Sequence, residues 1–203
     1  MSLDRIRLAS LHDKVISADQ AAEFIQDGMT VGMSGFTRAG EAKAVPQALV
    51  HRAKANPLKI TLITGASLGN DLDKQLTEAG VLARRLPFQV DNTLRRAINN
   101  GEVMFIDQHL SETVEQMRNL QLKRPDVAVI EAIAITEDGG IIPTTSVGNS
   151  ASFAIFAEKV IVEINTSLSE AFEGLHDIYI PTYRPTRQPI PLTKVDERIG
   201  TTA

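Results

Sequence analysis

Cysteine and tryptophan are both absent from the 203 residues of this chain, and aromatic residues make up only 4% of it. Without cysteine there is no disulfide framework, no thiolate nucleophile and no cysteine-based zinc site. With so few aromatic rings, the core has to be built mainly from Val, Ile, Leu and Ala, the residues that fill buried parallel sheets. With 43% hydrophobic and 23% charged residues, the composition is typical of a globular protein with a sizeable core.

Long runs of one charge and long apolar runs are also missing. Acidic residues number 25 and basic residues 21, giving a net charge of −4 without a block of like charges, so nucleic acid is not an expected partner. Charges interrupt the first segment, MSLDRIRLASLHDKV, where a signal peptide needs an apolar stretch, and no later run is long enough to span a bilayer. We therefore expect a cytoplasmic protein without a membrane partner.

Short apolar runs alternate with segments of helical periodicity along most of the chain. This alternation predicts an α/β fold with an open, mostly parallel sheet flanked by helices. Capping-box residues Ser17 and Gln20 mark the start of one helix, and Pro46 fits the first turn of another. Further helices are expected before Gly80, before Gly101 and over 110–117. The expected strands are 30–33, 59–64, 103–106, 127–135 and 160–164, the last two in central positions of the sheet.

The last part of the chain has a different composition. Four of the nine prolines fall within 181–203, with few large apolar residues between them. This pattern predicts one domain over 1–180 and an extended connector over 181–203. A connector implies a further domain, so we expect the chain to be part of a longer protein or to work with a second half on another chain.

A glycine-containing loop follows the expected strand 30–33. Ser34, Gly35 and Phe36 come at the carboxyl end of that strand, where open α/β sheets bind ligands. Arg38 and Lys43 follow, so an anion at this loop would meet positive charge. The loop has neither the Walker nor the dinucleotide-binding spacing. The alternative is an ordinary turn in which Gly35 only supplies an unusual backbone angle.

A second polar loop spans 144–150. Its hydroxyl groups, together with Gly148, the Asn149 amide and Ser150, are suited to hydrogen-bond a substrate carboxylate or acyl oxygen. Alternatively, Asn149 or Ser150 only caps the helix that follows. These two interpretations are equally compatible with the residues alone.

Other polar residues offer weaker patterns. Asp107 and His109 resemble an acid/base pair, but no third ligand accompanies them, so no metal site is expected. Glu112, Glu115 and Arg118 read as a solvated helix face.

Three longer segments carry a family resemblance: DGMTVGMSGFTRAGEAKAVP, LPFQVDNTLRRAINNGEVMFIDQHLSE and IPTTSVGNSASFAIFAEKVIVEIN. In this order they resemble the acetyl-CoA hydrolase/transferase branch of the CoA-transferase superfamily, and the resemblance runs from about Asp4 to the C-terminus. Ser34 departs from the Gly-Gly-Phe turn of the superfamily. The resemblance implies a CoA-transferase-like fold, which some sugar-phosphate isomerases share.

The resemblance also implies an activity. Members of this family move CoA between an acyl-CoA and a free carboxylate such as acetate, succinate or propionate, or hydrolyse acetyl-CoA. A glutamate of the C-terminal half, in a Glu-Asn-Gly or Glu-Ser-Gly turn, carries the chemistry through a glutamyl-CoA thioester. Glu137 and Glu173 do not lie in such a turn and are expected to be loop carboxylates in water. We therefore expect no catalytic residue in this chain.

By the same resemblance, Ser34, Gly35, Phe36, Arg38, Gly148, Asn149 and Ser150 are expected to face the substrate and CoA. The CoA thioester would be a substrate, with no covalently bound cofactor. The expected partners are the chain's own C-terminal domain and a second copy in a homodimer, in acetate or propionate metabolism. The alternatives are a non-catalytic module that binds a sugar phosphate or small anion, and a sugar-phosphate isomerase. The first would be expected to carry a helix-turn-helix and the second its own acid/base set, and neither pattern is visible.

Overall fold

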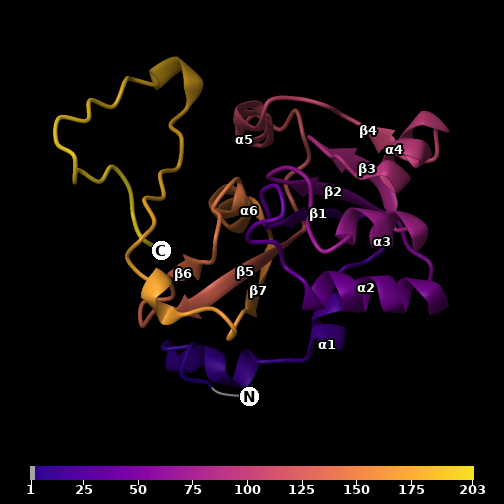
Figure 1. Ribbon diagram of the computed structural model, residues 1–203, viewed down its shortest axis with the longest axis horizontal. Helices are drawn as coiled ribbons and strands as arrows, with labels where there is room; N and C mark the ends of the chain where they lie inside the picture. The colour runs from indigo at the N-terminus through magenta and orange to yellow at the C-terminus, as the bar shows by residue number, and fades with distance from the viewer. Residues whose placement is uncertain (1–2) are drawn as a thin grey trace.

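In the computed structural model, which describes residues 3–203, a seven-stranded sheet separates two layers of helices (Figure 1). Five of its six parallel strands form one row. In spatial order they are β4 (Met104–Phe105), β3 (Leu82–Leu86), β2 (Ile60–Thr64), β1 (Thr30–Met33) and β5 (Val127–Ile135). The distal half of β5 pairs antiparallel with β6 (Ile141–Pro143), and its first half pairs parallel with β7 (Lys159–Ile164). The predicted α/β fold with a mostly parallel open sheet is confirmed.

Alternating residues of β5 show how the helices cover the two faces. Val127 and Val129 belong to the larger apolar cluster, which is filled from α1 to α4, whereas Ala128 and Ile130 belong to a second cluster with side chains of α5 and α6. This two-residue alternation is the geometry of a strand buried on both faces. No helix within residues 3–203 combines the length and hydropathy of a membrane span. The helices are α1 (Ala18–Ala22), α2 (Ala44–Ala55), α3 (Leu72–Glu78), α4 (Asn92–Asn99), α5 (Leu110–Arg118) and α6 (Ser150–Phe156).

Several local expectations are confirmed, and two strands are additional. The capping box of Ser17 and Gln20 is formed at the start of α1. The bounds of β1 and β5 agree with the predicted 30–33 and 127–135. The additional strands are β6 and β3, and the sequence of β3, LARRL, has two adjacent arginines in place of a continuous apolar run.

The expected central position of 160–164 is wrong. Within the part of the chain that the structure describes, β7 pairs with β5 only, so it lies at the margin of the sheet. Lys159 and Val160 are exposed. A β-branched run is compatible with a central or a marginal strand, and the neighbours that decide between them are distant in sequence.

Residues 181–203 run away from the sheet and back again, as the yellow segment of Figure 1 shows. Ile178 and Thr201 exchange two backbone hydrogen bonds of 2.7 and 2.9 Å, which close this segment at its base. Arg187 lies 3.4 Å from the Glu115 carboxylate, and Arg118 lies 3.1 Å from it. Glu115 is 5% exposed, so assigning it to a solvated helix face was wrong: Arg187, in the outgoing part of this segment, pairs with it.

Candidate functional site

The order of the strands changes direction at β1. After β1 the chain builds β2, β3 and β4 on one side and then crosses to β5 on the other side. In open parallel sheets, ligands bind outside the carboxyl ends of the strands at such a switch point. The loops 34–43 and 65–71, which follow β1 and β2, lie at this edge, and loop 144–149 after β6 packs against them.

These three loops contact one another backbone to backbone. A Cβ atom on Gly65 would lie 2.6 Å from the Gly35 carbonyl oxygen, so no side chain fits there. A Cβ on Gly40 would lie 3.1 Å from the backbone nitrogen of Ser146. The Ser146 hydroxyl donates a hydrogen bond of 2.8 Å to the Ala39 carbonyl. Glycine thus allows the loops to form one closely packed platform.

A buried carboxylate, Glu131, joins the platform to the sheet. Glu131 lies in β5 and is 3% exposed. Its carboxylate accepts hydrogen bonds from Lys43 Nζ at 2.5 Å, Thr144 Oγ1 at 2.5 Å and Asn165 Nδ2 at 2.9 Å. Its backbone N–H donates to Ser34 Oγ at 2.9 Å. One side chain thereby holds the segments that follow β1, β6 and β7, and its charge is paired as a buried charge requires.

Another carboxylate, Glu163 of β7, fixes the end of the first loop. The side chain of Lys43, the N-cap residue of α2, forms no cap hydrogen bond. Instead, Glu163 Oε1 accepts from the backbone N–H groups of Lys43 and Ala44 at 2.6 and 3.0 Å, and Oε2 accepts from Val45 at 3.0 Å. These donors have no partner inside the helix, and the positive end of the helix dipole favours the negative charge.

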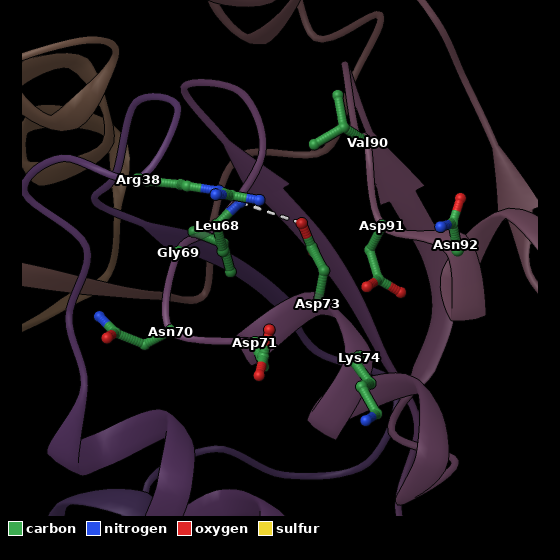
Figure 2. Close-up of a pocket in the computed structure, with 10 residues that line it drawn as sticks. All are labelled: Arg38, Leu68, Gly69, Asn70, Asp71, Asp73, Lys74, Val90, Asp91 and Asn92. Carbon is green, nitrogen blue, oxygen red and sulfur yellow. Dashed lines mark hydrogen bonds between the residues drawn. The ribbon is translucent and has the colours of Figure 1, made fainter.

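Two pockets open onto the platform, and Arg38 and Asn70 line both of them. The first, of about 310 Å³, lies between the loops that follow β1, β2 and β3 (Figure 2). The second, of about 470 Å³, lies at the switch point between β1 and β5. The first is lined by Arg38, Leu68, Gly69, Asn70, Asp71, Asp73, Lys74, Val90, Asp91 and Asn92, and the second by Arg38, Gly40, Glu41, Lys43, Asn70, Glu131, Thr145, Asn165, Ser167 and Leu168.

Asp73, which lines the first pocket, belongs to a buried ion pair. Arg85 of β3 contacts Asp73 of α3 at 2.9 Å, and the two side chains are 0% and 3% exposed. Arg85 also donates to the Ala66 carbonyl at 2.9 Å. Asp73 accepts from the Leu68 N–H at 2.9 Å, the bond drawn as a dashed line in Figure 2. The pair therefore holds the loop after β2 in place.

A further buried carboxylate, Glu41, lines the second pocket. Glu41 is 3% exposed and accepts a hydrogen bond of 2.5 Å from Asn70 Nδ2. This bond links the loop after β1 to the loop after β2.

The four predicted residues of the first loop occupy different environments. The hydroxyl of Ser34 is engaged with Glu131, and the residue is 2% exposed. Gly35 has φ +135°, and a Cβ there would contact Leu68 and Glu41, so the turn does need glycine. Phe36 and Arg38 are exposed, and Arg38 alone of the seven predicted residues lines the two pockets.

The second predicted loop lies beside the first. A Cβ on Gly148 would lie 3.6 Å from Gly65 Cα and 3.8 Å from Phe36 Cβ. Asn149 occupies the N-cap position of α6 but makes no side-chain cap hydrogen bond; its amide lies 3.5 Å from the Leu110 carbonyl. Ser150 is the first residue of α6 and is 5% exposed.

The weaker candidates lie on the surface. Asp107 and His109 are exposed, and residues 3–203 contain no group of three or more potential metal ligands. Glu173 pairs with Arg7, whose hydrogen bond holds the pKa of this carboxyl below its usual range. Glu137 is exposed and lies 3.8 Å from Arg7. Both glutamates are loop carboxylates, as expected.

Sequence reasoning missed the carboxylates that organise the site: Glu41, Asp73, Glu131 and Glu163. Glu131 carried a usable signal, because it is the one charged residue in the apolar run VAVIEAIAI. A charge inside a strand that is buried on both faces has to be paired. Thr144, a candidate for substrate contact, is 0% exposed and bonded to Glu131.

Comparison with known proteins adds the family. Residues 2–197 match the family described as acetyl-CoA hydrolase/transferase N-terminal domain. The chain belongs to this family. Succinyl-CoA:acetate CoA-transferase of Clostridium kluyveri is 44% identical to it over 200 residues, which are 98% of this chain and 37% of that protein. Acetyl-CoA hydrolase of Kluyveromyces lactis is 39% identical over 208 residues, covering 97% of this chain and 39% of that protein.

The fold agrees with this family membership. The crystal structure of glutaconate coenzyme A-transferase from Acidaminococcus fermentans superposes with a TM-score of 0.57 at 15% sequence identity, covering 74% of this chain and 68% of that one. At such low identity the similarity shows the fold alone, and the predicted CoA-transferase-like fold is confirmed.

Proposed function

We propose that this chain is the N-terminal part of an enzyme that moves CoA between an acyl-CoA and a free carboxylate, with hydrolysis of acetyl-CoA as a related activity. The observation that carries the proposal is the match of residues 2–197 to the N-terminal domain of a hydrolase/transferase family. The two relatives described above, which are far longer than this chain, are named for these two reactions. A binding module for sugar phosphates is not favoured, since neither relative is named for one.

The proposed role of this chain is to bind the carboxylate and the acyl end of the substrates. Ser34, Gly35, Phe36 and Arg38 would form one wall of the cleft, and Gly148 to Ser150 would form another. The hydrogen bonds of Glu131 and Glu163 keep these loops in one arrangement before substrate arrives. Such preorganisation reduces the cost of placing the reacting groups.

We infer that the nucleophile lies outside these residues. A glutamate carboxylate of the C-terminal half would attack the thioester carbonyl, breaking the C–S bond to give an acyl-glutamyl anhydride and the CoA thiolate. The thiolate would then attack the glutamyl carbonyl, releasing the free acid and leaving glutamyl-CoA. In hydrolysis, water would take the place of the acceptor acid. Neither Glu41 nor Glu131 suits this role, because both are buried and hydrogen-bonded within the platform.

The same proposal covers the connector, the cofactor, the cellular location and the oligomeric state of the enzyme. Residues 181–203 would lead into the C-terminal domain, CoA thioester would be a substrate without a covalently bound cofactor, and the enzyme would work as a cytoplasmic homodimer. Acetate, propionate and succinate are the acids to consider.

The test uses this chain joined to its C-terminal half. The preparation is incubated with succinyl-CoA and acetate, and acetyl-CoA and free CoA are measured. Formation of acetyl-CoA, with a CoA adduct on a glutamate outside residues 1–203 in mass spectra, is expected. Failure to transfer CoA to any of the three acids, together with failure to hydrolyse acetyl-CoA, would contradict the proposal.

A further inference from the structure

Arg38 lies in a strained turn. Phe36 and Ala39 exchange two backbone hydrogen bonds, of 2.8 and 3.1 Å, around Thr37 and Arg38. These two central residues have φ of +48° and +69°. Turns with two left-handed central residues normally carry Asn-Gly, and a β-branched residue such as threonine is particularly unfavourable there. Strain of this kind persists only where the surrounding structure imposes it, and it points to a functional role.

The neighbouring loops impose the conformation. A Cβ on Gly69 would lie 3.0 Å from Arg38 Cα, so the loop after β2 presses on the backbone of the turn. On the other side, Ser146 holds the Ala39 carbonyl at 2.8 Å. The position from which the Arg38 side chain extends is therefore fixed.

The guanidinium of Arg38 is available for a ligand. Across residues 3–203, its side chain forms neither a hydrogen bond nor an ion pair with the protein, although it lines both pockets. Figure 2 shows it extending from its loop toward the first pocket. A guanidinium binds a carboxylate through two parallel hydrogen bonds, which makes an anionic group the natural partner.

The second pocket is better suited to that anion than the first. Its two acidic side chains are already engaged, Glu131 with Lys43 at 2.5 Å and Glu41 with Asn70 at 2.5 Å. Of its other polar side chains, Thr145 is exposed and its hydroxyl has no hydrogen-bond partner within residues 3–203, so it can donate to a ligand, whereas the Ser167 hydroxyl already donates to Asn165 Oδ1 at 2.5 Å. In the first pocket Asp71 is exposed, and within residues 3–203 its side chain forms no hydrogen bond or ion pair, so its charge would repel an anion.

From these observations, and resting on the proposed CoA transfer, we propose that Arg38 binds the second, non-reacting carboxylate of a dicarboxylic acyl group of the succinate type. A paired guanidinium stabilises a carboxylate in its anionic form. If the guanidinium paired with the reacting carboxylate instead, it would oppose the reaction, because that carboxylate loses its charge, and with it the ion pair, when it becomes an anhydride. The distal carboxylate stays anionic throughout, so Arg38 would strengthen binding without slowing the reaction and would select dicarboxylic over monocarboxylic acids.

The experiment measures acid preference in this chain joined to its C-terminal half. Steady-state kcat and KM are determined for succinate and for propionate with acetyl-CoA as the common donor. For Arg38→Gln we expect the ratio of kcat/KM for succinate to that for propionate to fall about 10- to 100-fold, as expected for a lost hydrogen bond to a charged group. The change should lie mainly in KM for succinate, because the same contact is present before and during the reaction. Arg38→Lys should fall between wild type and Arg38→Gln.

Two further variants complete the design. Lys74→Gln removes the exposed cation that lines only the first pocket, and it should leave the succinate-to-propionate ratio as in wild type. The double variant Thr37→Asn with Arg38→Gly gives the turn its preferred residues. It should unfold at a higher temperature than wild type and yet lose the succinate preference as Arg38→Gln does.

The outcomes separate this inference from the proposed function. If wild type transfers CoA and Arg38→Gln keeps the wild-type ratio, the Arg38 assignment is wrong and the proposed function stands. An equal loss of preference in Lys74→Gln would also overturn the assignment, because general electrostatics would then explain it. If wild type transfers CoA to no acid, the proposed function fails first and this inference fails with it.

Discussion

At the residue scale, the site depends on charges that are buried in pairs. Asp73 and Arg85 are almost fully removed from water, and their contact holds the loop after β2. In Asp73→Ala the guanidinium would stay buried with its backbone acceptors only. We expect the free energy of unfolding to fall by about 3–5 kcal/mol, the usual cost of removing one partner of a buried pair. Urea denaturation followed by circular dichroism measures this loss.

The matched control is an exposed ion pair of the same chemistry. Arg184 and Glu112 lie 2.5 Å apart, with side-chain exposures of 50% and 38%. Because water screens such a pair, Glu112→Ala should lower the free energy of unfolding far less than Asp73→Ala does. If both substitutions cost the same, burial would not be the reason for the importance of Asp73.

Single residues also show which contacts cannot be predicted from the sequence. The Glu in VAVIEAIAI signals a paired charge, but its partners Lys43 and Asn165 lie 88 and 34 positions away in the chain. Only the tertiary structure selects them from the other basic and polar residues. Ser34 is predicted to face the substrate, and the partner of its hydroxyl, the Glu131 N–H, lies 97 positions away. The polar residues were visible in the sequence, and their partners were not.

At the scale of elements, one carboxylate links the entry of β1 to the entry of β5. Asp126 accepts from the Thr30 N–H and from Lys123 Nζ, both at 2.7 Å. Partial burial raises the pKa of Asp126, but the hydrogen bonds from Lys123 and Thr30 outweigh this effect and keep the pKa below its usual range. A lowered pKa in the folded state means that this stabilisation is complete above the unfolded value of about 3.9 and disappears as the pH falls through the folded value.

The prediction concerns the difference in unfolding free energy between wild type and Asp126→Asn. The difference should be constant from pH 7 down to about pH 4.5 and should shrink at lower pH, because the asparagine does not titrate in this range. Urea unfolding at a series of pH values measures it. A difference that stays constant down to pH 2, or that grows on acidification, would argue against the link.

Elements with strong local patterns were predictable, and those defined by distant neighbours were not. Alternating burial on two faces produces the apolar runs of β1 and β5, so their bounds were recognisable. In β3 the burial is mixed: Ala83 is exposed, whereas Arg85 is buried with its charge paired to Asp73, so no continuous apolar run marks the strand. The β7 run looked central because its residues favour strands, although strand propensity does not report how many neighbours a strand has.

At the scale of the whole molecule, alternation of strands and helices predicted the fold class, and the switch point beside β1 follows from the strand order. The activity did not follow from the residues by the same route. Glycine turns and hydroxyl-rich loops suit many anionic ligands, so only the family resemblance favoured CoA chemistry. The platform is held together by the hydrogen bonds of its carboxylates, Glu41, Glu131 and Glu163, which are therefore already engaged within the protein.

The last prediction is that this chain alone is catalytically silent toward acyl-CoA. The proposed covalent route needs an accessible carboxylate at the thioester carbonyl, whereas Glu41 and Glu131 are each 3% exposed and already hydrogen-bonded. Correct orientation of reacting groups is worth on the order of 7–11 kcal/mol, so without the nucleophile the rate should stay near background. The purified chain is mixed with succinyl-CoA and acetate, CoA exchange is followed, and mass spectra are searched for a CoA adduct.

Adding the separately produced C-terminal half should restore exchange if the halves dock, because it would bring the missing carboxylate to the preformed platform. Exchange by the chain alone, or an adduct on one of its own glutamates such as Glu173, would show that the nucleophile lies in this chain.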